Sequence, residues 1–246
     1  MTTIDLNCDL GEGAGHDAEL MPLITSANIA CGGHAGDHAT MINSIDLAAA
    51  AGVSIGAHPG LNDRFGMGRR NLPLSPAEAA DLIAVQVGEL IQLAGLRGVK
   101  VAHVKPHGAL YLRAARDRSI ADAIAEAVRA INPALALYGL AGGELLRAGR
   151  ARGLRVASEV FADRTYRPDG SLTPRGSADA LITDEAEAVA QVLRIVQEGL
   201  VRATDGSDMA VVADTVCLHG DGAQALAFAW RLRAELAAAG IGVKAF

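Results

Sequence analysis

The stretch IACGGHAGDH, from Ile29 to His38, joins an apolar run to a turn that carries ionisable side chains. Its first residues suit a buried strand, two glycines follow, and His34, Asp37 and His38 then fall within five positions. In folds built from parallel strands, the loops after the carboxyl ends of the strands hold the ligand, and glycines there let the backbone approach it closely. The stretch therefore predicts a parallel strand that opens directly into a functional loop.

The rest of the chain repeats this pattern of strand and polar turn. Short runs rich in Val, Ile, Leu and Ala alternate with longer segments of helical period, which is typical of a parallel sheet covered by helices. The predicted strands are Ile4–Cys8, Ala27–Ala30, Val53–Ala57, Val101–Lys105, Leu135–Gly139, Arg155–Glu159 and Thr215–Leu218. Such strands form an open, doubly wound sheet or close into a barrel. The 246 residues match the usual length of one barrel, roughly 250 residues, so we expect an α/β fold with a single (β/α)7 TIM-like barrel domain over residues 1–246.

Capping residues mark where helices begin. Ser75 and Glu78 form a capping-box pattern around a proline. Asp37 is open to two interpretations, either as the N-cap of a helix over 38–51, which would leave His38 facing water, or as part of a binding loop. His34 and His38 are four residues apart and would share one face of a helix, where both could bind a metal ion.

Composition excludes several classes of partner. The net charge is −6, and Lys and Arg are scattered, which indicates neither a nucleic acid nor an anionic membrane as partner. No segment approaches the roughly 18 uninterrupted apolar residues of a spanning helix, and the N-terminus lacks a secretory leader pattern. Cys8, Cys31 and Cys217 are odd in number and widely spaced, which fits a reducing compartment. We therefore expect a cytoplasmic protein.

Ionisable side chains follow six of the seven predicted strands. The loops read NCDLGEG (7–13), CGGHAGDH (31–38), HPGLNDRFGMGRR (58–70), KPHGALY (105–111), EVFADRTY (159–166) and HGDG (219–222). After the fifth strand, YGLAGGE carries no such cluster. Because the carboxyl ends of parallel strands meet at one end of a barrel, we expect these side chains around one mouth.

Lys105 is expected to face that mouth. It shares strand parity with Val101 and His103, and it lies beside His107 in the chain. A fixed cation in this place could bind a carboxylate or a phosphate, or polarise a carbonyl group. The alternative is a lysine whose stem lies along the surface with its ammonium in water.

Further charged residues occur in the predicted mouth loops. The arginines that suit bidentate binding of an anion are Arg69, Arg70, Arg164 and Arg175. The carboxylates that suit general acid–base chemistry, or that could hold these arginines, are Asp9, Glu12, Glu159, Asp163 and Asp221. The sequence shows neither a phosphate-binding GxxxxGK[ST] loop nor a GxSxG elbow, so it indicates neither a nucleotide site nor a serine hydrolase.

The chain resembles the LamB/YcsF family in seven ordered segments: DLNCDLGEG, ANIACGGHAGDH, IGAHPG with GRR, KPHGALY, EVFADRTY, LTPRG and CLHGD. The resemblance runs from about Ile4 to the last predicted helix, and it implies a barrel related to the glycoside hydrolase and metal-dependent deacetylase barrels. Gly33, Leu61 and Met67 stand where the family usually has aromatic residues, and His38 stands where it usually has proline.

The resemblance also implies an activity, the cleavage of 5-oxo-L-proline to L-glutamate coupled to ATP hydrolysis. ATP would be a co-substrate handled together with two partner subunits, B and C, which activate the lactam. The catalytic candidates on this interpretation are Asp9, Glu12, His34, Lys105 and His107. The substrate-binding candidates are Asn7, Asn28, Asp37, His58, Arg69, Glu159, Asp163, Arg164, Arg175, His219 and Asp221.

Two other functions stay open at this point. The first is a stand-alone metal-dependent deacetylase or amidohydrolase, in which Asp9, His34 and His58 would hold a divalent ion by analogy with the deacetylase barrels. The second is a non-catalytic subunit whose mouth binds an intermediate and hands it over. Metal content would favour the first, and full activity after neutralising the mouth carboxylates would favour the second.

Overall fold

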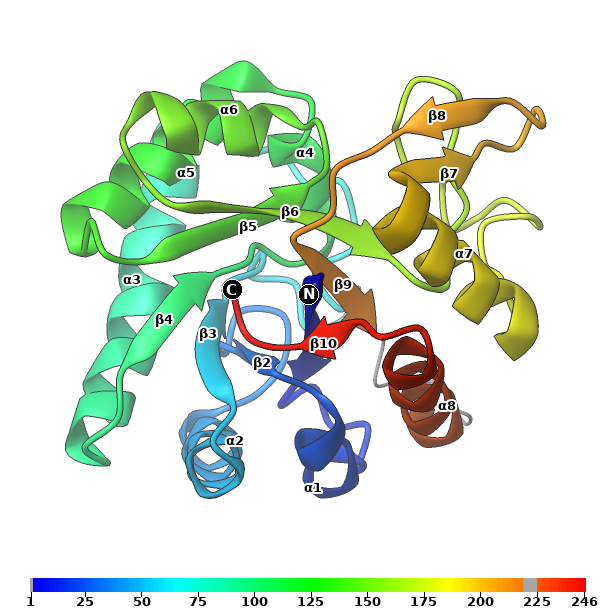
Figure 1. Cartoon of the computed structure of the whole chain (residues 1–246). Coiled ribbons are helices and arrows are strands. Elements are labelled where there is room, and N and C mark those ends of the chain that lie inside the picture. Colours follow the sequence, from blue (N-terminus) through cyan, green and yellow to red (C-terminus); the bar gives the residue numbers. More distant parts are fainter. Residues whose placement is uncertain (1, 219–224) are drawn as a thin grey trace.

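A barrel of parallel strands forms the centre of the molecule (Figure 1). The computed structural model describes residues 2–218 and 225–246, and within them seven strands pair in the order β1-β2-β3-β4-β5-β6-β9, with β9 pairing back to β1. The strands of the barrel are β1 (Thr3–Leu10), β2 (Ser26–Ala30), β3 (Ser54–His58), β4 (Val101–Val104), β5 (Ala136–Leu140), β6 (Val156–Phe161) and β9 (Thr215–Leu218). Each pairing is parallel, so all the carboxyl ends lie at one mouth.

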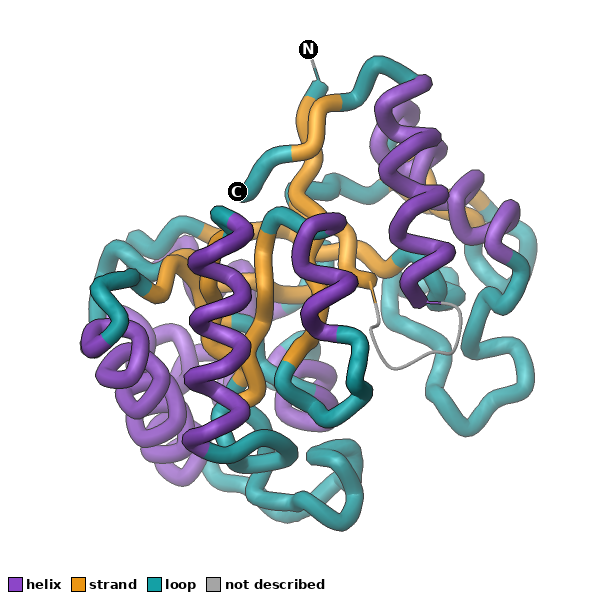
Figure 2. Tube along the Cα trace, turned by 90° about the horizontal axis from the view of Figure 1, so that it is seen from below, coloured by secondary structure: helices purple, strands orange, loops and turns teal. Residues whose placement is uncertain are grey.

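Helices surround the barrel, as the view from below shows (Figure 2). They are α1 (Asp17–Leu20), the 3-10 turn η1 (Met21–Leu23), α2 (His38–Ala51), α3 (Pro76–Leu96), α4 (Gly108–Ala114), α5 (Arg118–Ile131), α6 (Glu144–Ala151), α7 (Glu185–Glu198) and α8 (Ala225–Ala238). The described residues contain three further short strands: β10 (Gly242–Val243) pairs parallel with the start of β1, and β7 (Leu200–Arg202) pairs antiparallel with β8 (Asp208–Ala210).

The predicted closed barrel is confirmed. Every predicted strand is present, and the bounds differ from the predicted ones by no more than two residues at either end. The sequence did not indicate the β7–β8 hairpin, because each of its strands has three residues and carries exposed positions. The hairpin lies outside the barrel together with α7 (Figure 1).

The predicted helix caps are also confirmed. Ser75 and Glu78 form a capping box, in which the Ser75 hydroxyl accepts from the Glu78 N–H and the Glu78 carboxylate accepts from the Ser75 N–H. Asp37 caps α2, and its carboxylate accepts from the backbone N–H and the hydroxyl of Thr40, each at 2.8 Å. His38 is consequently a first-turn residue on the surface, where it pairs with Glu89.

The interior of the barrel is polar, which is unusual for a fold whose interior is normally filled by Val, Ile and Leu. Along β1 the polar residues Asp5, Asn7 and Asp9 alternate with apolar residues such as Leu6 and Cys8. Leu6 and Cys8 belong to the hydrophobic core between the strands and the helices. Since successive side chains of a strand point to opposite faces, the first set faces the barrel axis.

Asp5 anchors the amino-terminal end of this interior. Its carboxylate accepts hydrogen bonds from Ser26 at 2.8 Å, from Thr215 at 2.7 Å and from the Tyr138 hydroxyl at 3.0 Å. Burial raises the pKa of this carboxyl group, although the four hydroxyl donors around it, Thr25 included, act in the opposite direction. The floor of the barrel is thus a hydrogen-bonded layer rather than an apolar plug.

Helix α3 has the length and composition that a membrane-crossing helix would need. In this fold it begins at the capping box and packs against α5, β3 and β4. Its buried residues are Ala79, Ile83, Gln86, Val87, Leu90 and Ala94. They recur at helical spacing, so the helix presents one mainly apolar stripe to the barrel.

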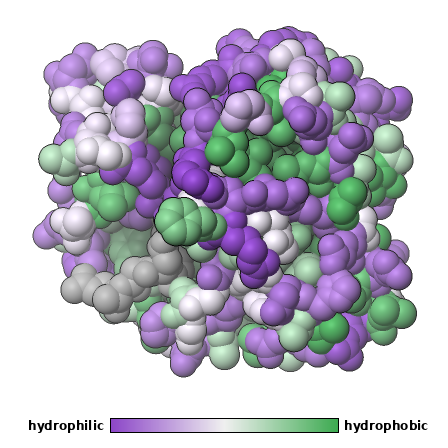
Figure 3. All heavy atoms as spheres, turned by 180° about the vertical axis from the view of Figure 1, so that it is seen from behind, coloured by the Kyte–Doolittle hydropathy of each residue, from purple (hydrophilic) through white to green (hydrophobic). Residues whose placement is uncertain are grey.

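The surface of the molecule is mixed in character. On the face shown in Figure 3, hydrophilic residues alternate with patches of apolar residues.

Candidate active site

A cavity of about 340 Å³ opens at the carboxyl ends of β1, β3, β4 and β6. Its volume lies near the lower limit of roughly 300–1,000 Å³ for small-molecule sites. The predicted residues that line it are Asp9, Glu12, His58, Arg69, Lys105, His107, Arg164 and Arg175. Two larger clefts, of about 450 and 810 Å³, lie along α3 and beside β8, and no histidine lines either of them.

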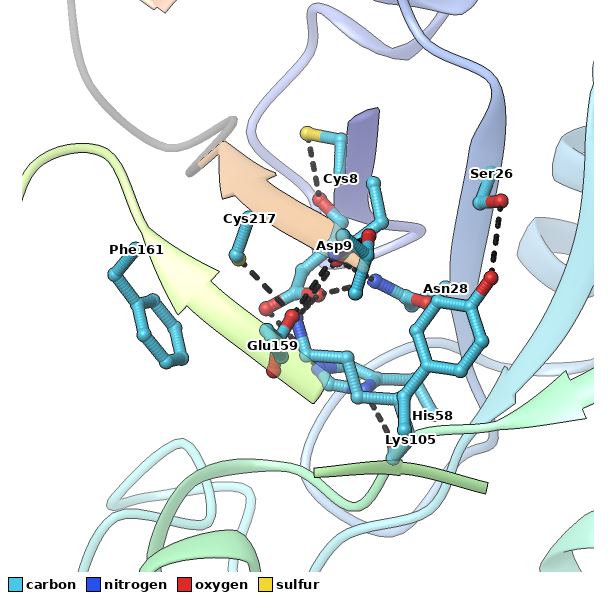
Figure 4. Close-up of polar contacts among 12 residues, drawn as sticks. Cys8, Asp9, Ser26, Asn28, His58, Lys105, Glu159, Phe161 and Cys217 are labelled. Atoms are coloured by element: carbon cyan, nitrogen blue, oxygen red, sulfur yellow. Dashed lines mark hydrogen bonds and ion pairs between the residues drawn. The ribbon is translucent and has the colours of Figure 1, made fainter. Parts of the chain in front are cut away.

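Lys105 sits at the base of this cavity in a group that we call the lysine network: Asn7, Asp9, Asn28, Lys105 and Glu159 (Figure 4). The Lys105 ammonium lies 2.9 Å from Asp9 Oδ1 and 2.8 Å from Glu159 Oε1. Burial by itself lowers the pKa of Lys105, but the charges of Asp9 and Glu159 outweigh it and hold the pKa well above its usual value. The lysine is 2% exposed, so the interpretation as a surface lysine is wrong.

Asn7 and Asn28 are fully engaged within the network. The Asn7 amide donates to Glu159 at 2.9 Å, and its oxygen accepts from Lys105 at 3.0 Å and from Asn28 at 2.7 Å. The Asn28 amide also donates to Asp9, and its oxygen accepts from His103 Nε2 at 2.8 Å. Both asparagines were predicted to bind substrate. Their positions instead make them positioning residues, because they are buried beneath the cavity.

A second group, the histidine cluster, lies beside the lysine network and consists of Glu12, His34, His58 and His107. Glu12 Oε1 lies 3.1 Å from His34 Nε2, 3.3 Å from His107 Nδ1 and 3.8 Å from His58 Nε2. The two imidazole nitrogens His58 Nε2 and His107 Nδ1 are 2.9 Å apart. The four side chains come from the loops after β1 and β2, from the end of β3 and from the loop after β4.

Backbone carbonyls fix the tautomers of two of these histidines. His58 Nδ1 donates to the carbonyl oxygen of Lys105 at 2.7 Å, and His107 Nε2 donates to that of Met67 at 2.8 Å. Because a carbonyl oxygen only accepts, each of these nitrogens carries the proton. In the neutral rings the other nitrogens, His58 Nε2 and His107 Nδ1, then hold lone pairs that face each other.

Burial favours the neutral form of His34 and of His107. It lowers the pKa of His107 to about 3, and the neighbouring His58 and His34 act in the same direction. Burial also lowers the pKa of His34, against the opposing effect of its hydrogen bond to Glu12. For Glu12, burial and the charge of Asp9 raise the pKa, but the hydrogen bond with His34 and the neighbouring His58 and His107 outweigh them, so the pKa is lowered overall. Glu12 is therefore a carboxylate at neutral pH.

Glycines in the loop after β3 make room for these rings. A Cβ atom at Gly60 would lie 2.4 Å from His34 Nδ1, and one at Gly68 would lie 2.8 Å from His34 Cβ. The neighbouring Met67 adopts a left-handed backbone conformation with φ of 50°, and its carbonyl is the one that orients His107. The family difference at Met67 thus falls on a residue that acts through its backbone.

Gly33 is likewise required by the close approach of neighbouring atoms. A Cβ atom there would lie 2.5 Å from Gln86 Nε2 and 2.6 Å from the carbonyl oxygen of Gly60. Gln86 uses this space to brace the loop, since its amide accepts from Gly60 N–H at 3.0 Å and donates to the Gly60 carbonyl at 2.8 Å. Any larger residue at position 33 would require Gln86 to move.

Three arginines line another side of the cavity. Arg164 is buried, and its guanidinium donates to the carbonyls of Ala180 at 3.2 Å and Thr173 at 2.6 Å, which fixes the loop that carries Arg175. Burial lowers the pKa of Arg164, and the charge of Arg175 adds to this effect. Arg69 and Arg175 are exposed at the rim of the cavity. The cavity therefore combines a cationic side with the histidine–carboxylate side.

Some predicted residues lie elsewhere. Asp37 does not line the cavity, and its carboxylate caps α2, so the structure gives it a capping role instead of a place beside the predicted substrate. Asp163 is half-buried next to Arg164 and does not line the cavity either. His219 and Asp221 lie outside the described residues.

Sequence reasoning missed several residues that line the cavity. Leu112, Phe161 and Leu172 provide apolar walls, and Tyr111 lines the base. Tyr111 Oη and Glu159 Oε2 are both buried and make no hydrogen bond within the described residues. The tyrosine ends the predicted KPHGALY segment, so its place after the fourth strand was the available signal.

The sequence comparisons assign the chain to a family. The LamB/YcsF family model matches residues 4–246, and the chain belongs to this family. It is 54% identical over 250 residues to a Tolumonas auensis protein named as the A-subunit of 5-oxoprolinase, with the full length of both chains covered. It is also 46% identical to the solved lactam utilization protein of Thermus thermophilus, with complete coverage of both chains and a TM-score of 0.93.

More distant structures share the fold alone. The catalytic domain of a peptidoglycan N-acetylglucosamine deacetylase from Eubacterium rectale matches with a TM-score of 0.53 at 12% identity, covering 100% of this chain and 88% of that one. The relation to deacetylase barrels that the sequence implied is therefore confirmed for the architecture.

Proposed function

We propose that this chain is the A-subunit of an ATP-dependent 5-oxoprolinase, which converts 5-oxo-L-proline to L-glutamate in the cytoplasm together with partner subunits B and C. The names of the similar full-length relatives support the reaction. The three buried free cysteines agree with a reducing compartment.

The observation that carries this proposal is the pairing of two chemically different sides in one small cavity. Arg69, Arg164 and Arg175 suit an anionic group, and the histidine cluster with Glu12 suits proton transfer. Between them lie Leu112, Phe161 and Leu172, which suit a small ring of apolar edges. A five-membered lactam with a carboxylate, or its phosphorylated form, has this combination of features.

The reaction needs activation, because an amide is a poor electrophile. Transfer of the ATP γ-phosphoryl group to the lactam oxygen leaves ADP and an O-phosphorylated ring. Water then adds to the former carbonyl carbon, and the ring C–N bond breaks as the nitrogen takes a proton, which gives γ-glutamyl phosphate. A second water molecule releases phosphate and glutamate. The sequence contains no phosphate-cradling loop of the GxxxxGK[ST] type, so we assign the first transfer to the partner subunits.

The hydrolytic steps fall to the cavity of this chain. Glu12 is a half-buried carboxylate with a lowered pKa, so it can accept the proton of the attacking water. Glu12 can then pass this proton to the ring nitrogen, because the inward-facing nitrogens of neutral His58 and His107 hold lone pairs and carry no proton. The arginines bind the substrate carboxylate and the phosphoryl group, and Lys105 fixes Asp9 and Glu159 beneath them.

The histidine cluster also supports a second candidate, a stand-alone metal-dependent amidohydrolase, because four donor groups converge there. The two functions differ in their need for ATP. Only the first requires one ATP to be consumed for each glutamate formed.

The test is reconstitution of the chain with subunits B and C and measurement of glutamate and ADP with 5-oxoproline as substrate. We expect equal amounts of both products from the complex, and neither product from the chain or from the B and C pair alone. Glutamate formation by the isolated chain without ATP would favour the amidohydrolase. No glutamate from the complete complex would reject the proposal.

A further inference from the structure

The histidine cluster places four potential ligand atoms around one point. One atom each from Glu12, His34, His58 and His107 lies within 4.8 Å of all the others. Glu12 lies 3.1–3.8 Å from the three histidine nitrogens, and the His58 and His107 nitrogens are 2.9 Å apart. Ligands at about 2.0 Å from a tetrahedral metal ion would be about 3.3 Å apart, which falls inside this range.

The positions of the imidazole protons also favour a bound cation. The carbonyls of Lys105 and Met67 hold the protons of His58 and His107 on the nitrogens that face away from the cluster. The nitrogens that face each other at 2.9 Å are therefore both acceptors unless one ring is charged. A cation between these two lone pairs would satisfy both nitrogens.

The formal charges of the neighbouring ion pairs leave room for a cation. Asp9, Glu12 and Glu159 supply three negative charges, and Lys105 supplies one positive charge. Three negative charges and one positive charge leave two negative charges in a largely buried group. A divalent ion would neutralise them.

The supporting shell resembles that of a prepared metal site. Metal-binding histidines usually donate their second nitrogen to a carbonyl or carboxylate, which fixes the ring. His58 and His107 do this with Lys105 and Met67. Gly60 and Gly68 leave the space that the His34 ring fills beside them.

We propose that Glu12, His34, His58 and His107 bind a divalent transition-metal ion of the zinc class. Three imidazole nitrogens and one carboxylate oxygen favour Zn²⁺ or Co²⁺ over Mg²⁺ or Ca²⁺, which prefer oxygen ligands. The set shares His34 and His58 with the trio predicted from sequence, but Glu12 and His107 replace Asp9. Asp9 Oδ1 is held by Lys105 and Asn28, and Asp9 Oδ2 lies 3.3 Å from His58 Nε2 at the edge of the set.

The metal itself can be measured on the full-length chain without partner subunits. The protein is stripped with a chelator, dialysed and titrated with Zn²⁺ by calorimetry, and with Co²⁺ by visible absorption. We expect one ion per chain and a cobalt spectrum of low coordination number. Glu12→Gln preserves the size of the side chain and should weaken metal binding by at least about 10-fold. Even residues that only hydrogen-bond to metal ligands usually cost about that much affinity when they are replaced. The double variant His58→Ala/His107→Ala should lose the cobalt spectrum.

His38→Ala is the matched control, because His38 lies on the surface beside Glu89 and outside the cluster. It should bind both ions as the wild type does. Circular dichroism establishes that each variant is folded, and the Glu12→Gln measurement stands if the double variant is not. Absence of binding to the wild type, or an unchanged cobalt spectrum in folded Glu12→Gln, would overturn the inference. Since no substrate is used, this result is independent of whether the complex forms glutamate.

Discussion

The lysine network and the histidine cluster lie side by side at one mouth but bury their polar groups in different ways. In the lysine network the ammonium of Lys105 contacts two carboxylates, and both asparagines use their amide oxygens and nitrogens. In the histidine cluster the lone pairs of His58 and His107 face each other. The first group pairs its charges internally and stabilises the barrel, with Glu159 Oε2 as its one buried oxygen that makes no hydrogen bond within the described residues. The second is completed by a proton or a cation, so we place the chemistry there.

The largest effect is expected from Lys105→Met. This change leaves the carboxylates of Asp9 and Glu159 buried without their cation, and breaking a buried pair in this way costs about 3–5 kcal/mol. Urea unfolding followed by circular dichroism measures the loss. Adding Glu159→Gln, which removes one of the stranded charges, should recover part of it. A stability within about 0.5 kcal/mol of wild type would show that the network is not structural.

Acid should destabilise the protein through the buried neutral imidazole of His103, which donates to Asn28 of the lysine network. Burial lowers the pKa of His103 to about 3, and Lys105 and His58 add to this effect. Between that value and the ordinary 6.5 the unfolded chain binds more protons, so stability falls as the pH drops below about 6.5. One such histidine contributes about 1.4 kcal/mol per pH unit. Urea unfolding at pH 7, 6 and 5 should show a shallower loss for His103→Gln, and equal slopes would contradict this account.

Two of the three buried tyrosines, Tyr111 and Tyr138, offer a smaller contrast. Tyr138 Oη donates to Asp5 at 3.0 Å, whereas Tyr111 Oη has no partner in good hydrogen-bonding geometry among the described residues, although burial and the nearby Glu159 raise its pKa. Tyr138→Phe should therefore cost about 1–2 kcal/mol, and Tyr111→Phe should change the free energy of unfolding by less than about 0.5 kcal/mol. A comparable loss in both variants would mean that Tyr111 has a partner in solution.

The smallest effect is expected from Asp37→Ala. It removes the N-cap of α2 and should lower the midpoint of thermal unfolding slightly, because the N–H of Thr40 loses its acceptor. Turnover of the reconstituted complex should stay at the wild-type level. A clear loss of turnover in a folded variant would return Asp37 to the substrate site.

The sequence was sufficient for the barrel but not for the interior of the site. Strand order and the mouth loops followed from alternating periodicities, which depend on local residues. Which mouth residues bind each other and which face the cavity depends on contacts between distant segments, such as that of His58 with the Lys105 carbonyl. No local sequence pattern encodes these contacts. The alternation of Asp5, Asn7 and Asp9 along β1 was a visible signal of a polar interior.

Asp37 shows that a nearby functional motif can also suggest a role that local geometry does not support. Its neighbours His34 and His38 made a functional loop the attractive interpretation, yet an aspartate before a helix caps it by purely local geometry. His34 faces Glu12 and His38 faces Glu89, so adjacent residues of one motif belong to the interior and to the surface. A turn between them, which spacing alone does not specify, separates the two.

The most direct test of where the chemistry occurs is glutamate formation by the complex with subunits B and C that contains Glu12→Gln. This variant keeps the shape of the side chain and removes the carboxylate that lies between the histidines. We expect turnover at saturating 5-oxoproline to fall by at least about 100-fold, while the chain stays folded by circular dichroism and still assembles. Turnover within about twofold of the wild type, under the same conditions, would contradict the assignment of the chemistry to the histidine cluster.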